Sequence, residues 1–119
     1  ACVTVMHNFD ARAFYNKWIQ DIIGSSNKET GYVPNGAPWQ PGCGGGVAWG
    51  AAISIMPWEF YIHYGDTDIL KDSYDAMKGY VRYMLKWTDA EGIMFSQARG
   101  HEWSAYRPEP MTKTITGAE

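Results

Sequence analysis

Two glutamates that lie beside tryptophans are the residues of this chain best suited to chemistry. Glu59 follows Trp58 in an otherwise apolar stretch, and Glu102 lies between His101 and Trp103 in a polar one. Glycosidases place a carboxyl group beside aromatic rings to raise its pKa or to hold a sugar hydroxyl. The pattern therefore indicates carbohydrate chemistry. The alternatives are a structural hydrogen bond for Glu59 and a solvated loop for Glu102.

The other residue types that carry chemistry do not form recognisable sites. Glycines at 42 and 44–46 precede an expected helix, but no GxGxxG or GK[ST] pattern accompanies them, so we expect no phosphate site. His7, His63 and His101 lie far apart and lack HExxH or CxxC company, which favours structural or solvent-exposed histidines over a metal site. No serine or cysteine lies in a nucleophile elbow. We expect neither a metal nor a cofactor.

The composition is that of a weakly acidic globular protein of one domain or less. The chain has 119 residues, of which 45% are hydrophobic, and its net charge is −3. It has no basic run, so nucleic acid is not an expected partner. The longest uncharged stretch, Pro38–Trp58, is broken by glycine and proline, so we expect no membrane span. Residues 1–10 do not resemble a signal peptide.

Aromatic residues and cysteines leave more than one interpretation open. The chain has six tryptophans and eight tyrosines, whose rings either stack on the apolar faces of sugars or fill a core. We assign most of them to the core. Cys2 and Cys43 show no CxxC spacing, which favours free, buried thiols over a disulfide between them.

Apolar residues at helical spacing predict that the chain is helical. Asp10 is the expected N-cap of the first long helix, and residues 24–27 are expected to end it. The three long helices are expected near residues 11–23, 47–64 and 67–88, after a short helical end at residues 1–8.

The connections between these helices predict a helical hairpin. Pro57 is expected to kink the second long helix, because proline lacks the N–H that a helix interior uses. Gly65 and Asp66 suit a tight turn followed by an N-cap, so the last two helices should pack antiparallel. The long loop at 28–46 is a place where function is expected.

The last thirty residues are expected to hold little regular structure. A short extended piece is expected at residues 93–95, followed by a polar loop through Pro110. Residues 111–119 could open another helix. We expect no sheet beyond one short hairpin.

Five segments, in order, resemble those of bacterial alpha-L-rhamnosidases. The first is NFDARAFYNKWIQDI at residues 8–22, which is similar to the family's NFD-x-x-x-FYRKWL segment. The next are Trp49-Gly50 with PWEFYIHYGD at 57–66, similar to WGDA…PWELYRHYGD, and the helix at 69–85. The last are GHEW at 100–103 and EPMTKTITGAE at 109–119, similar to GDW and TPKELIGTA. Each segment alone is weak, but the ordered set is fairly specific.

The resemblance implies an all-α fold of helical hairpins that form part of an (α/α)6 toroid, incomplete on its own. It also implies inverting hydrolysis of terminal alpha-L-rhamnose by two carboxylic acids acting through a water. The family's acid lies in a segment like DERLGWTGDA and its base far downstream, so both are expected outside residues 1–119, a partial catalytic domain. The implied partners are a rhamnose-containing carbohydrate and the remainder of the parent chain.

The same resemblance implies which residues contact substrate. Trp49 matches the WGDA segment and Trp103 the GDW segment, and we expect both rings to face one concave surface with Glu102 and His101. Two departures put the usual sugar contacts in doubt, because Ala51 replaces the aspartate of WGDA and Glu102 that of GDW. The rival interpretation is that both tryptophans belong to the core.

Other interpretations remain beside this one. The chain could be a non-catalytic carbohydrate-binding or structural helical module, or a piece of another (α/α)6 glycosidase such as a trehalase. The isolated chain is expected not to hydrolyse rhamnosides, and its exposed apolar helix faces are expected to favour self-association. Bacterial cytoplasm and periplasm both stay open as locations.

Overall fold

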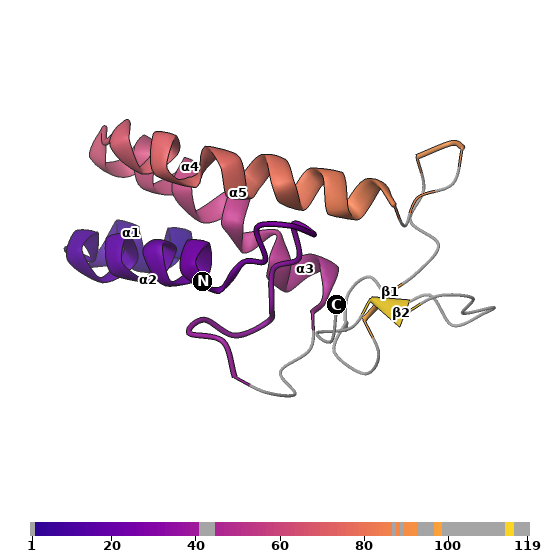
Figure 1. Cartoon of the computed structure of the whole chain (residues 1–119). Helices are drawn as coiled ribbons and strands as arrows, with labels where there is room; N and C mark the ends of the chain where they lie inside the picture. The colour runs from indigo at the N-terminus through magenta and orange to yellow at the C-terminus, as the bar shows by residue number, and fades with distance from the viewer. Residues whose placement is uncertain are drawn as a thin grey trace.

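The computed structural model describes residues 2–40, 45–86, 88, 90–92, 97–98 and 114–115, and these are predominantly helical (Figure 1). Among the helices of these residues, none combines the length and apolar character needed to cross a bilayer. The elements are α1 (Cys2–Asn8), α2 (Arg12–Ser25), α3 (Val47–Gly50), α4 (Ala52–Tyr64), α5 (Asp68–Leu85), β1 (Gln97–Ala98) and β2 (Thr114–Ile115).

Helices α4 and α5 form the predicted antiparallel hairpin. Gly65 ends α4 in the left-handed conformation, with φ of 68°, and its N–H bonds to the Tyr61 carbonyl at 2.8 Å. In Figure 1 the orange α5 runs back along α4, while α1 and α2 lie below this hairpin. Both α1 and α2 contact α4, and α2 also contacts α5. The described residues therefore contain an all-α packing of neighbouring helices.

The core lies where these helices meet. Ile19 of α2, Ile53 and Phe60 of α4, and Ile69 and Tyr83 of α5 are almost fully buried. In α2 the buried residues Tyr15, Ile19 and Ile22 recur at helical spacing. Helix α4 is apolar on its exposed side as well, where Ile55, Trp58 and Ile62 lie. Phe60 has no exposed surface, so it is a principal packing contact of the hairpin.

The start of α2 differs from the expected N-cap at Asp10. Ala11 precedes the helix and no side chain caps it. Instead the Ala11 N–H donates to the Tyr64 hydroxyl at 3.3 Å, so a residue of α4 supplies the partner. At the other end α2 continues through Gly24 to Ser25, and the Ser26 hydroxyl donates to the Ile23 carbonyl at 2.6 Å.

The helix expected at 47–64 is divided at Ala51 into α3 and α4, and the expected kink at Pro57 stays a prediction. The N–H groups of Gly50 and Ala51 close the short α3 by bonding to the Gly46 and Val47 carbonyls at 2.8 and 3.0 Å. The Ala51 carbonyl then begins α4 by accepting from the next turn. Pro57 lies inside α4, which continues on both sides of it although proline has no N–H to donate.

Asp66 caps α5 from two residues before its first helical residue. Its Oδ1 accepts from the N–H groups of Asp68 and Ile69 at 2.9 and 3.4 Å, as the turn sequence predicted. Its Oδ2 lies 3.2 Å from the Arg12 guanidinium, which ties α2 to this turn. Desolvation opposes ionisation of Asp66, but these hydrogen bonds and the Arg12 charge outweigh it, so the pKa of Asp66 is lowered.

The structure after α5 differs from the expected one. Helix α5 ends at Leu85, three residues before the expected position, and Thr88 bonds back to the Leu85 carbonyl with its hydroxyl at 2.9 Å. Thr114–Ile115 is a strand paired in parallel with Gln97–Ala98, where a helix opening at 111–119 and at most a short hairpin had been expected. The expected extended piece at 93–95 and Cys43 lie outside the described residues.

Candidate functional site

An open groove of about 610 Å³ lies between α1, α2, the loop after α2, and the α3–α4 segment. We call it the aromatic groove. Its principal lining residues are Tyr15, Trp18, Pro34, Asn35, Trp49 and Ile55. Most of the lining is apolar, and no carboxylate of the described residues contributes to it. A groove of this size is in the range that binds small ligands, and aromatic walls suit the apolar face of a sugar.

Trp49, which the resemblance implies contacts substrate, lies at this groove, and the contact itself stays a prediction. It is part of α3, and 41% of its surface is exposed, so it is not a core residue of the described part of the chain. Two contacts fix the backbone around it. The Asn35 Oδ1 accepts from the Gly46 N–H at 2.6 Å, and the Tyr80 hydroxyl donates to the Val47 carbonyl at 3.0 Å.

Trp18 is a second exposed indole in the groove, and the sequence reasoning assigned it only to an apolar helix stripe. Its surface is 38% exposed, and its ring stacks on Tyr15 with centroids 6.0 Å apart and planes 27° apart. The ring of Phe14 meets Trp18 edge-on at 5.7 Å. Contacts with two neighbouring rings reduce the freedom of the indole, which suits a binding surface.

Tyr15, whose ring stacks against Trp18, is buried. Burial raises the pKa of the Tyr15 hydroxyl, and the nearby Cys2 and Tyr64 raise it further. The hydroxyl is therefore neutral at physiological pH. Cys2 is a free, partly buried thiol, so the prediction of a free thiol is confirmed for this cysteine.

Three of the four predicted site residues cannot be placed beside Trp49. His101, Glu102 and Trp103 lie outside the described residues, so their common surface with Trp49 stays a prediction. Ala51, which stands where the resembled family has aspartate, is the turn residue between α3 and α4. Its methyl group offers no hydrogen bond to a sugar hydroxyl.

Glu59 and two histidines cluster elsewhere, on α1 and α4. The Nδ1–H of His63 donates to the Glu59 backbone carbonyl at 2.8 Å, and the Glu59 carboxylate lies 3.8 Å from the same nitrogen. The His7 ring meets the His63 ring edge-on, with centroids 4.5 Å apart. None of the three lines the aromatic groove, and these contacts favour structural roles. Within the described ranges, no three His, Cys, Asp or Glu side chains are arranged to hold a metal ion.

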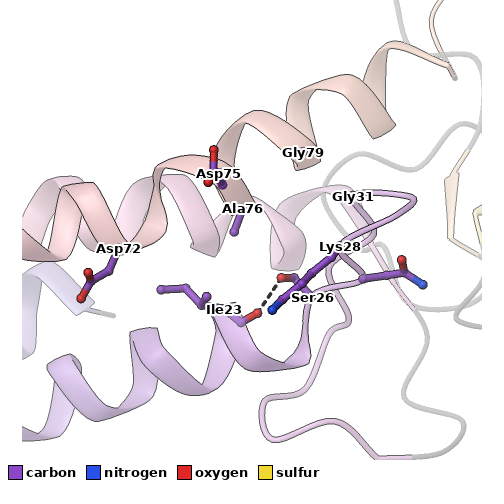
Figure 2. Close-up of a pocket in the computed structure, with 9 residues that line it drawn as sticks. Ile23, Ser26, Lys28, Gly31, Asp72, Asp75, Ala76 and Gly79 are labelled. Atoms are coloured by element: carbon purple, nitrogen blue, oxygen red, sulfur yellow. Dashed lines mark hydrogen bonds between the residues drawn. The ribbon is translucent and has the colours of Figure 1, made fainter.

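A second cleft, of about 440 Å³, lies between the end of α2, the following loop, and α5 (Figure 2). Figure 2 shows Asp72 and Asp75 on α5 and Lys28 on the loop. Asp72 already accepts from Gln20 at 2.9 Å. No aromatic ring lines this cleft, so it lacks the stacking surface found at Trp49.

Antiparallel helices with an aromatic groove beside them define the chain as an all-α, helical-hairpin type of domain. Residues 1–116 match the family model described as the bacterial alpha-L-rhamnosidase six-hairpin glycosidase domain. The chain therefore belongs to this family of glycoside hydrolase domains, whose six hairpins are those of an (α/α)6 fold, as the ordered segments predicted.

Several alpha-L-rhamnosidases are similar to the chain. That of Formosa agariphila is 31% identical over 103 residues, covering 78% of this chain and 11% of the relative. That of Alteromonas sp. (strain LOR) is 35% identical over 81 residues, covering 66% of this chain and 8% of the relative. That of Streptomyces avermitilis is 31% identical over 87 residues, covering 72% of this chain and 8% of the relative. The chain thus spans about a tenth of these relatives. No solved structure matches it.

Proposed function

We propose that this chain forms part of the substrate-contacting wall in the catalytic domain of an enzyme that removes terminal alpha-L-rhamnose from a glycan or glycoside. The observation that carries this proposal is the half-exposed Trp49 ring at the aromatic groove, within a chain of the rhamnosidase family. The aligned segments make up only 11% and 8% of two relatives, which supports a role within a longer polypeptide.

The proposed role of Trp49 is to stack on the apolar side of the sugar. A 6-deoxysugar has a methyl group and a face of C–H bonds, which an indole covers well. Trp103 would supply a second ring, with Glu102 and His101 offering hydrogen bonds to sugar hydroxyls. Ala51 offers none, so these two polar residues would replace the contact made by the family's aspartate.

The proposed chemistry is inverting hydrolysis, with the acid and base supplied by segments beyond these residues. Inversion requires two carboxyl groups about 6.5–9.5 Å apart, with a water between one of them and the sugar. The described part of the aromatic groove contains no carboxylate, so the chain's own contribution there is binding and orientation.

The same absence favours a second candidate function. A groove of aromatic rings without described carboxylates also fits a carbohydrate-binding module that hydrolyses nothing. Both functions predict that rhamnose binds, but only the hydrolase predicts that a rhamnoside is cleaved. Measuring binding and cleavage with the same purified protein therefore distinguishes them.

Helices α4 and α5 carry exposed apolar side chains that other parts of the longer chain could cover. Trp58 and Ile62 on α4 and Val81 and Leu85 on α5 are all more than half exposed. We propose that neighbouring hairpins of the parent protein cover them, because isolated apolar faces of this kind favour contact with other apolar surfaces. Self-association of the chain through the same faces stays a prediction.

The experiment is hydrolysis of an aryl rhamnoside by the longer enzyme that carries this segment. Trp49→Ala should lower kcat/KM by about 5- to 150-fold, which corresponds to about 1–3 kcal/mol for one aromatic contact. Trp49→Phe keeps a ring and should retain most of the activity. Rhamnose binding without turnover in the unmutated enzyme would favour the binding module. Equal activity of Trp49→Ala and the unmutated enzyme would refute the contact.

A further inference from the structure

The first turn of α3, which carries Trp49, is attached directly to helix α5. The Tyr80 hydroxyl donates to the Val47 carbonyl at 3.0 Å. Gly50, the last residue of α3, lies directly against the Tyr80 ring: a Cβ atom at position 50 would be 2.4 Å from the hydroxyl oxygen. Tyr80 therefore contacts α3 on both sides of Trp49 in sequence.

This attachment matters because α3 is short and is joined to α4 only through Ala51, so contacts with other elements help to fix it. It has four residues, and a single helical turn is unstable in water without outside contacts. Helix α5 has 18 residues and packs along α4, so it is a rigid support. Asn35 adds one more fixed point, because its side chain accepts from the N–H of Gly46, the residue before α3.

We propose that Tyr80 is a positioning residue for substrate binding, which fixes the turn of α3 and thereby aims the Trp49 ring at the sugar. This inference rests on the proposed contact between Trp49 and substrate. Tyr80 does not touch the sugar, since it is buried and does not line the aromatic groove. Its effect passes through the backbone of Val47 and Gly50.

Tyr80→Phe tests the hydroxyl with little disturbance to the fold. The Val47 carbonyl also accepts from the Ala51 N–H at 3.0 Å, so it keeps a partner when the hydroxyl is removed. In the longer enzyme, Tyr80→Phe should raise KM for an aryl rhamnoside about two- to tenfold, with kcat changed less, since the loss is in binding.

Tyr74→Phe is the control. It removes a tyrosine hydroxyl from the same helix, α5, at an exposed position that does not line the aromatic groove. Its KM should equal that of the unmutated enzyme. Gly50→Ala is a second test, because its methyl group would displace the Tyr80 ring, and it should raise KM at least as much as Tyr80→Phe.

A double-mutant cycle separates positioning from a general structural effect. If Tyr80 acts through Trp49, Tyr80→Phe should leave KM unchanged when Trp49 is already alanine. The same fold-increase in both backgrounds, or an increase in Tyr74→Phe as well, would overturn the positioning role. An unchanged KM in both Tyr80→Phe and Gly50→Ala would also overturn it. An unchanged KM in Trp49→Ala alone would instead refute the proposed sugar contact.

Discussion

Gly31 provides a sharp test of how the loop after α2 is held on α5. It has φ of +84°, which side-chain-bearing residues rarely adopt, and a Cβ atom there would lie 2.0 Å from the Gly79 carbonyl oxygen. A carbon and an oxygen normally approach to about 3.3 Å, so Gly31→Ala requires a shift of about 1.3 Å. The shift must come from the backbone, because the atoms that this Cβ would meet all belong to the main chain of Gly79.

The expected cost has two parts. The left-handed conformation costs about 1–2 kcal/mol for a residue with a Cβ atom. Overpacking against a rigid helix adds about 1–3 kcal/mol. We therefore predict that Gly31→Ala lowers the free energy of unfolding by about 2–5 kcal/mol, measured by urea denaturation.

Gly65→Ala isolates the first part. Gly65 also has a positive φ, of 68°, but a Cβ atom there would meet nothing within 4 Å. Its expected cost is only the conformational one, about 1–2 kcal/mol. If the two variants lose the same stability to within about 0.5 kcal/mol, the close approach of Gly31 to Gly79 is not a packing constraint, and the reasoning fails.

Two further predictions concern the hairpin. Phe60→Ala should lower the free energy of unfolding, measured with denaturant, by about 3–5 kcal/mol, because the ring is fully buried. Ile62→Ala, at an exposed position of the same helix, should lower it far less in this chain. Since the pKa of Asp66 is lowered in the fold, its contribution to stability should be present at neutral pH and lost as the pH falls below about 4. The difference in free energy of unfolding between the unmutated protein and Arg12→Gln should therefore shrink between pH 7 and pH 3. A difference that does not change with pH would contradict this.

The α4–α5 hairpin was predictable because several local signals agree. The apolar stripe of α5, Gly65 at the turn and the cap at Asp66 each favour the same structure over a short stretch of chain. The start of α2 was not predictable by the same means. Asp10 satisfies the local rule for an N-cap, but Tyr64, 53 residues away from Ala11, supplies the partner. Capping rules do not include such tertiary donors and acceptors.

The candidate site divides in the same way. Trp49 was assigned from its resemblance to a family segment, and the structure places it in the wall of a groove, while its contact with substrate stays a prediction. Trp18 was missed because helical spacing cannot distinguish a ring in a core from a ring in the wall of a groove. The distinction depends on the loop at Pro34 and Asn35 and on α3, which together form the rest of the wall.

The break at Ala51 shows why the orientation of Trp49 could not come from local sequence. The stretch from Val47 to Tyr64 has the apolar pattern of one helix, and nothing in that pattern predicts the division at Ala51. The chain instead closes a separate turn whose carbonyl at Val47 accepts from Tyr80, 33 residues further on. A glycine at position 50 is what lets that tyrosine approach so closely. If Tyr80 positions this turn as we propose, substitutions at Tyr80 should affect substrate binding although the residue lies outside the groove.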